Sequence, residues 1–316
     1  MNTFPTPTTP VIAKLNPDGT LDQSFQQGII QGTLIELPGG FNSDLLIEID
    51  PSGRIVLFGN NPADSSGVQN FAVSRLNPDG TIDTSFANDG NQFILGSSFT
   101  DTGSVSEVLG LDVLDNGDIT LAFTLQDFLD PTFVVSRLLA DGSVDRGFGD
   151  NGFFVRSFES APRTDLFQPT PGGGSAYVFS VQGSDVDTLL LLNPDGVVTA
   201  ETDLTLNSEI LFGSLSPFSG AFTLPGDLAV DQAGNIVFTS LRRIPGPFGP
   251  FNAQSSVVQR ILPSGELDTE FGLDGGAVLG DFSRETVATI FDSEDRLVVV
   301  GSGVSAGSGR SRFEFV

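Results

Sequence analysis

A short phrase recurs along the chain and constrains its fold more than any other feature. Its most regular copy, RLNPDGTIDTSF, spans residues 75–86, and related copies occupy 14–25, 137–148 and 260–271, with a reduced fifth copy at 191–202. The turn glycines of the five copies are Gly19, Gly80, Gly142, Gly196 and Gly265. Repetition at this period indicates that one supersecondary unit is used several times. A residue that recurs in every copy is therefore expected to serve the fold of that unit.

Each repeat predicts short β-strands and no helix. Apolar runs rich in branched side chains, such as FAVSRL at 71–76 and FVVSRL at 133–138, precede the phrase. Within the phrase, Asn-Pro-Asp-Gly is typical of a tight turn, in which proline presets one φ angle and glycine adopts a positive φ. A second hairpin lies in the middle of each repeat, as in LLIEIDPSGRIVLFG at 45–59, and an apolar stretch precedes it. The fifth of these hairpins carries Asp295 in place of the turn glycine.

About four strands per repeat predict an all-β fold, namely a single β-propeller. Five middle hairpins predict five four-stranded blades, closed into a ring by a terminal strand, VIAKLN at 11–16. Six blades are the alternative, because the outer type of strand occurs six times, and an antiparallel solenoid is the competing architecture. Residues 1–10 read as a Pro/Thr-rich lead-in, and residues 11–316 as the propeller itself.

The phrase, the Asp-Gly that follows it and the middle hairpin resemble the delta-60 repeat, a bacterial β-propeller repeat of unassigned function. The resemblance covers nearly the whole chain; it is strongest at 71–90, 133–152 and 256–275 and weakest at 164–202, where the Ser-Phe tail is missing. It implies a propeller of the kind found in large secreted or surface proteins. It implies no catalytic residues, because the family has none assigned.

Composition excludes several classes of function. The formal net charge is −26, with 40 Asp and Glu against 14 Lys and Arg, which disfavours binding to nucleic acid and attraction to anionic membranes. The sequence contains no run of about 18 apolar residues, so it predicts no membrane-spanning segment. With no His and no Cys, the chain has no Ser-His-Asp triad, thiol nucleophile or Cys-ligated zinc. Any catalysis would therefore depend on carboxylates, Arg, Tyr177, Lys14 or a bound hard metal ion.

The recurrent acids Asp22, Asp83, Asp145 and Asp268 follow the turn glycine by three residues, and we interpret them as caps of local turns. One calcium ion per blade is the alternative, because carboxylates suit a hard cation. The arginines that begin the phrase are expected to pair with these acids between blades. Otherwise the sequence predicts no cofactor.

A single active site must depart from the repeat, and unrepeated acids precede the middle hairpins. Asp44, Asp165, Asp227 and Glu285 occupy roughly equivalent positions, so we expect a ring of acids near one mouth of the channel. Such a ring is solvated or structural, holds a metal ion, or supplies the carboxylate pair of a glycoside hydrolase.

The other departure is an insertion in the fourth repeat, SLRRIPGPFGPFNAQSS at 240–256, which we interpret as a loop. It carries the adjacent pair Arg242–Arg243 together with Phe248 and Phe251. Arginine and aromatic residues are enriched at interface hot spots, so these four residues are the predicted binding residues for a partner. The alternative is that they pack against their own blade.

The sequence thus predicts a non-enzymatic binding or scaffold propeller of an extracellular or surface-exposed bacterial protein. Its loops would contact a protein or a glycan, without nucleic acid and without insertion into a membrane. A carboxylate-dependent glycoside hydrolase and a structural subunit of a larger assembly or filament are the alternatives, the latter through self-assembly.

Overall fold

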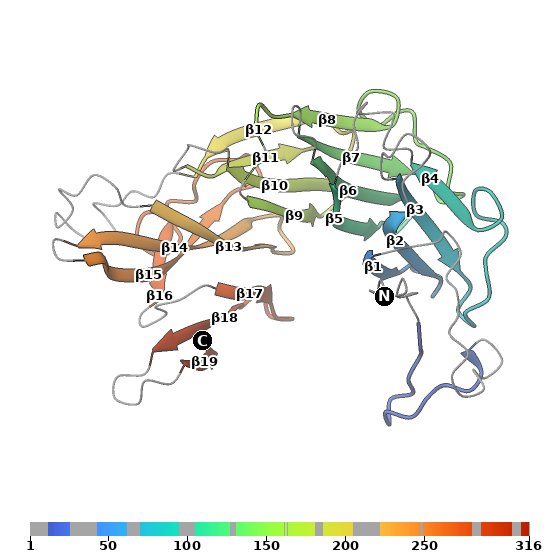
Figure 1. The fold of residues 1–316 in the computed structure, drawn as a ribbon, viewed down its shortest axis with the longest axis horizontal. Coiled ribbons are helices and arrows are strands. Elements are labelled where there is room, and N and C mark those ends of the chain that lie inside the picture. The colour runs from blue at the N-terminus through green and yellow to red at the C-terminus, as the bar shows by residue number, and fades with distance from the viewer. Residues whose placement is uncertain are drawn as a thin grey trace, which may run out of the picture. The chain divides into compact units, whose positions relative to one another are not determined.

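A computed structural model of the chain describes residues 12–25, 43–61, 70–94, 105–126, 131–160, 162, 164–180, 186–204, 222–246, 249–279, 286–304 and 311–315. These residues form antiparallel β-sheets and no α-helix, which confirms the all-β propeller class (Figure 1). The chain divides into two compact units, Met1–Ala161 and Pro162–Val316. Within the described part, no helix has the length and apolar character needed to span a membrane.

The first unit contains two four-stranded sheets, each with its strands in chain order. The first sheet comprises β1 (Ser43–Ile49), β2 (Ile55–Asn61), β3 (Asn70–Leu76) and β4 (Asn91–Ile94). The second comprises β5 (Val105–Val113), β6 (Ile119–Gln126), β7 (Thr132–Leu138) and β8 (Phe153–Ser157). The first strands of the two sheets, β1 and β5, are in contact.

The second unit contains the remaining sheets. The third sheet comprises β9 (Thr164–Thr170), β10 (Gly174–Ser180), β11 (Thr188–Leu192) and β12 (Val198–Asp203). The fourth comprises β13 (Phe222–Val230), β14 (Ile236–Gly246), β15 (Gly249–Ile261) and β16 (Gly276–Leu279). The fifth shows β17 (Thr286–Phe291), β18 (Leu297–Val304) and β19 (Ser311–Phe315). Here too the first strands are neighbours, since β13 contacts both β9 and β17.

In the first, second and fourth sheets the phrase connects the third strand to the fourth strand of the same sheet, as residues 75–86 do between β3 and β4. Its turn glycines have positive φ, from 75° at Gly196 to 87° at Gly142, as Asn-Pro-Asp-Gly predicts. Its phenylalanine enters the core of the next sheet. Phe86 packs with Ile119 and Leu121 of the second sheet, and the buried Phe25 packs with Leu57 of the first. The phrase thus contributes a buried aromatic ring to the hydrophobic core between the first and second sheets and to the core on the first sheet.

Three features differ from the expectations. The fourth strand of the third sheet comes from the reduced phrase itself, because β12 occupies residues 198–203. The insertion at 240–256 is not simply a loop, because β14 and β15 continue through it as a long antiparallel hairpin pairing Arg243 with Gln254 and Ile244 with Ala253. The return strand of the phrase is a single bridge, for example Leu76 with Ile82. Ring closure by residues 11–16 and the count of five blades remain predictions.

Candidate functional site

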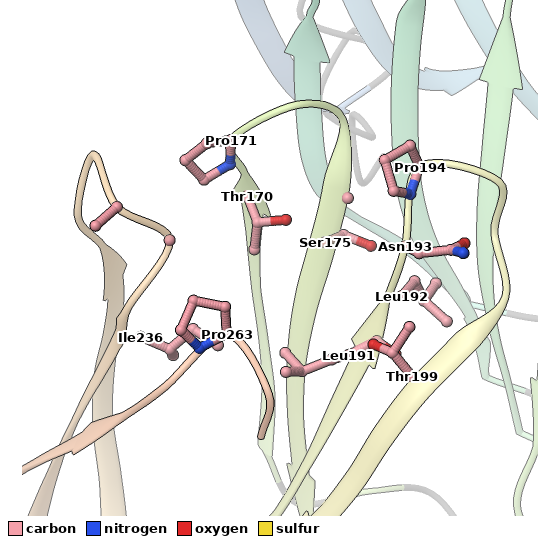
Figure 2. A pocket seen from close by; sticks show the side chains of 13 residues that line it. Thr170, Pro171, Ser175, Leu191, Leu192, Asn193, Pro194, Thr199, Ile236 and Pro263 are labelled. Carbon is pink, nitrogen blue, oxygen red and sulfur yellow. The ribbon is translucent and has the colours of Figure 1, made fainter. Parts of the chain in front are cut away.

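The candidate binding site is a cavity of about 270 Å³ within the second unit, between the third and fourth sheets (Figure 2). The β9–β10 turn, the reduced phrase, the β13–β14 turn and Pro263 of the fourth phrase enclose it. Its lining comprises Thr170, Pro171, Gly174, Ser175, Leu191, Leu192, Asn193, Pro194, Thr199, Ala233, Gly234, Ile236 and Pro263.

The cavity exists because the third repeat departs from the pattern. The middle hairpins of the first and fourth sheets have five residues between their last paired positions, 50–54 and 231–235, whereas that of the third sheet has only 171–173. A Cβ added to the turn glycines Gly53 and Gly234 would touch the proline of the phrase turn in the same repeat, Pro78 at 3.7 Å and Pro263 at 3.5 Å. At Gly172 of the third hairpin it would meet nothing within 4 Å. The shorter turn therefore leaves space where other repeats have contact.

Among the described residues that line the cavity, none has an ionisable side chain, although the chain has a net charge of −26. Leu191, Leu192 and Ile236 are buried and supply aliphatic surface. Threonine, serine and asparagine side chains add hydrogen-bonding groups (Figure 2). The carboxamide oxygen of Asn193 is already engaged, since it accepts the backbone N–H groups of Asp195 at 3.0 Å and Val197 at 2.9 Å. The arrangement suits a neutral ligand with both apolar and polar surface.

Of the unrepeated acids, Asp227 has a described side chain, and it links two sheets. Its Oδ2 accepts the backbone N–H of Thr289 on β17 at 2.6 Å, and its own N–H donates to Oγ1 of Thr239 at 2.9 Å. Burial raises the pKa of Asp227, against the effect of its hydrogen bonds from the backbone of Leu228 and Thr289. This carboxylate holds the β13 bulge against the neighbouring first strand, which is a structural role.

For the other three acids of the predicted ring, the structure describes at most the backbone. Asp44 lies in β1 and Asp165 lies in β9 opposite Phe179, but their side chains lie outside the described part, as does all of Glu285. The predicted ring of acids therefore remains a prediction. Among the described residues, no group of three or more Asp and Glu side chains is arranged to hold a metal ion.

Three of the four predicted binding residues of the insertion lie on the long hairpin. Arg242 and Arg243 are on β14, where they pair with Ser255 and Gln254, and Phe251 is on β15. Phe248 lies outside the described residues. Their role in binding a partner remains a prediction.

The recurrent acids cap turns, as the sequence predicts. Asp83 Oδ1 accepts from the N–H of Ser85 at 3.1 Å and from its hydroxyl at 2.5 Å. Its Oδ2 accepts from Nε of Arg75 at 2.8 Å, and the guanidinium lies 4.5 Å from the centre of the Phe86 ring. Arg260, Asp268 and Phe271 repeat the arrangement, with an ion pair of 2.6 Å and a ring distance of 4.7 Å.

The expectation that arginine and acid pair between blades is wrong for these copies, because both partners belong to one phrase. The bond between repeats goes instead to a carbonyl: Nη1 of Arg75 donates to the oxygen of Ala140 at 2.5 Å. Lys14 makes the equivalent contact with the oxygen of Pro78 at 3.3 Å. Because its acidic partner lies in the same phrase, the basic side chain stabilises its own turn and also donates a hydrogen bond to the next repeat.

The structure also shows an acid that sequence reasoning missed. Asp112 on β5 is half-buried, and burial, followed by the charge of Glu48 on β1, raises its pKa while Arg137 opposes the shift. Asp112, Thr120 and Arg137 lie opposite one another across three strands, and Arg137 donates to the Thr120 hydroxyl at 3.1 Å. Glu48 and Asp112 both stand five residues before a hairpin glycine, Gly53 and Gly117, and this shared register could have identified the pair.

Solved structures similar to this chain have low sequence identity to it. An alpha-L-arabinanase from Penicillium chrysogenum is 12% identical, with a TM-score of 0.47 over 86% of this chain and 77% of that one. The polysaccharide lyase Uly1 is 12% identical, with a TM-score of 0.43 over 86% and 76%. An endo-arabinase from Bacteroides thetaiotaomicron is 11% identical, with a TM-score of 0.36 over 90% and 79%.

No curated protein matches the chain significantly in sequence. The sequence profile of the family described as "Domain of unknown function (DUF5122) beta-propeller" matches residues 4–25 and 51–86, which contain the first two copies of the phrase. This match confirms the resemblance to a propeller repeat of unassigned function. Residues 4–25 and 51–86 are thus similar to the repeats of this β-propeller family, whose function is unknown.

Proposed function

We propose that this protein is a non-enzymatic binding and scaffold propeller of an extracellular or surface-exposed bacterial protein. The observation that carries the proposal is that several of the described carboxylates accept hydrogen bonds within the fold. Asp83 and Asp268 hold turns and arginines, and Asp227 accepts a backbone N–H from the next sheet. A carboxylate engaged in this way holds the scaffold together. The ligand-contacting surface that we assign is the cavity between the third and fourth sheets.

The test is a turnover screen on neutral and acidic polysaccharides, in which released reducing ends and unsaturated products are both measured. We expect no turnover by the wild-type protein. The variant Asp227→Asn keeps an acceptor for the Thr289 N–H and removes the buried charge, so its stability should match or exceed that of the wild type at pH 7. Turnover that Asp227→Asn abolishes while leaving the fold intact would overturn the scaffold proposal.

One observation favours a second candidate, a carboxylate-dependent glycoside hydrolase. Glu48 and Asp112 are two acids close enough to interact on neighbouring first strands, and Asp112 has a raised pKa. A raised pKa on one member of a carboxyl pair is what a general acid requires. If the turnover screen is positive, Glu48→Gln and Asp112→Asn separate the two assignments. Loss of turnover in both would place the reaction at this pair and not at Asp227.

A further inference from the structure

We propose that the cavity between the third and fourth sheets binds one uncharged sugar ring, presented as the terminal residue of a glycan. The inference rests on the proposed binding function and names its ligand class. Its starting point is the volume of about 270 Å³. This value lies just below the range of about 300–1,000 Å³ for small-molecule sites, so the cavity admits a single ring and leaves the rest of a chain outside.

Charge decides against most other ligands. Within the described lining no side chain can pair with a phosphate, a sulfate, a uronate or an ammonium group. An ionised ligand would therefore lose part of its hydration without gaining a partner for its charge, which is unfavourable. An anion would in addition approach a chain whose net charge is −26. A neutral ligand avoids both costs.

The lining has both polar and apolar groups, and this favours a sugar over a purely apolar molecule. The Thr199 hydroxyl donates to the oxygen of Leu191 at 3.4 Å and keeps lone pairs for a ligand donor, and Thr170 adds a second hydroxyl. A purely apolar molecule would cover both groups without offering hydrogen bonds, which is unfavourable. A sugar ring has hydroxyl groups at its edge for these residues and C–H groups on its faces for Leu191, Ile236 and the proline rings. Pro171, Pro194 and Pro263 line the cavity, with Thr170 and Ser175 between the first two in the view of Figure 2.

The opening suits the end of a chain. Pro171, Pro194, Thr199, Ala233 and Pro263 are exposed, so the cavity opens to solvent between two turns. In the reduced phrase that contributes to the lining, Val197 and Val198 expose 56% and 40% of their surface. The lining has no aromatic face for stacking, and we therefore expect weak binding, with a Kd on the order of 1 mM.

The experiment measures binding of methyl α-D-mannopyranoside, methyl β-D-galactopyranoside, methyl β-D-glucopyranoside and L-rhamnose by saturation-transfer difference NMR, with D-glucuronate and cyclohexanol as charged and apolar probes. The blocking variant is Ala233→Trp, which places a large ring at the exposed edge of the cavity. Its matched control is Ser52→Trp at the same turn position of the first sheet, where Gly53 lies near Pro78 as Gly234 lies near Pro263. Circular dichroism checks that both variants fold.

We expect at least one neutral sugar to bind the wild type and Ser52→Trp, and its signal to be lost in Ala233→Trp. Thr170→Val and Thr199→Val keep the shape of the side chain and remove the hydroxyl, so each should weaken binding by about 5-fold, the equivalent of one net hydrogen bond. Absence of binding by every neutral sugar, unchanged binding in Ala233→Trp, or preference for glucuronate or cyclohexanol would overturn the inference. These outcomes leave the scaffold proposal standing, because turnover of polysaccharide is what tests that.

Discussion

At the residue scale, the recurrent phrase works through a buried ion pair. The side chains of Arg75 and Asp83 are exposed by only 3% and 8%. A buried pair is costly to break, because the remaining charge has no partner, and the loss is typically about 3–5 kcal/mol. The cation–π contact of Arg75 with Phe86 adds to the cost, because the guanidinium contacts both the ring and the carboxylate.

We therefore predict that Asp83→Asn lowers the free energy of unfolding by about 3 kcal/mol at pH 7. Burial alone would raise the pKa of Asp83, but the hydrogen bonds from Ser85 and Arg75 outweigh it and hold the pKa below the usual 3.8. A depressed pKa contributes stability that is present above 3.8 and is lost as the pH falls through the folded-state value. Calorimetry between pH 7 and pH 2.5 should show a shallower acid dependence in Asp83→Asn. An equal acid dependence in variant and wild type would contradict this assignment.

Asp295 provides a second test at this scale. It has a φ of +59° at the position where Gly53, Gly117 and Gly234 stand in other hairpins. Residues with a Cβ are disfavoured in this region, although aspartate tolerates it better than most. Asp295→Gly should raise the free energy of unfolding by up to about 1 kcal/mol, measured by denaturation followed by circular dichroism. A lower stability would show that the Asp295 side chain makes a favourable contact.

At the scale of elements, the turn of one phrase packs on the tail of the previous phrase. A Cβ on Gly142 would lie 2.8 Å from both Ala87 and the Phe86 ring, and the N–H of Ala87 donates to the oxygen of Asp141 at 2.7 Å. The contact survives in altered form at the fourth repeat, where the Thr202 hydroxyl donates to the oxygen of Gly265 at 2.9 Å. Successive repeats are thus joined turn to tail.

Gly19 allows this contact to be measured separately from backbone strain. Gly19 and Gly142 have φ of +83° and +87°, but a Cβ on Gly19 would meet nothing within 4 Å. Alanine is equally strained at both sites, so any difference reports the contact between repeats. We predict that Gly142→Ala destabilises the protein by about 1–3 kcal/mol more than Gly19→Ala, because overpacking adds to the strain. Equal losses of thermal stability would show that the turn-to-tail contact contributes little.

The elements were predictable where one local rule decided them. Asn-Pro-Asp-Gly specified the phrase turns, and branched apolar runs specified strands such as β3 and β7. Local rules did not predict β12, because loss of the Ser-Phe tail freed residues 198–203 to pair with β11. They also did not predict the cavity. It lies where the turn of the third hairpin is two residues shorter than those of the first and fourth, and residues of the fourth sheet form its other side.

At the scale of the whole molecule, charge is the dominant property that sequence alone established. The net charge of −26 produces self-repulsion that opposes the compact state. Composition could not show that many acids are engaged in turns, since this depends on which N–H groups lie within reach. Asp22, Asp79 and Asp141 each accept from a residue two positions ahead, and Asp292 accepts from the N–H groups of Glu294 and Arg296.

The self-repulsion of the net charge and the engagement of acids in turns lead to opposite expectations for sodium chloride and for calcium. Sodium chloride screens self-repulsion, so raising it from 20 mM to 500 mM should raise the unfolding temperature measured by calorimetry. Calcium at millimolar concentration should raise it no more than magnesium at equal ionic strength, because the capping oxygens already accept N–H and hydroxyl donors. Calcium also needs six to eight oxygen ligands, which a single capping carboxylate does not supply. A calcium-specific rise that chelator reverses would show instead that acids beyond the described residues, such as Glu285, complete a metal site.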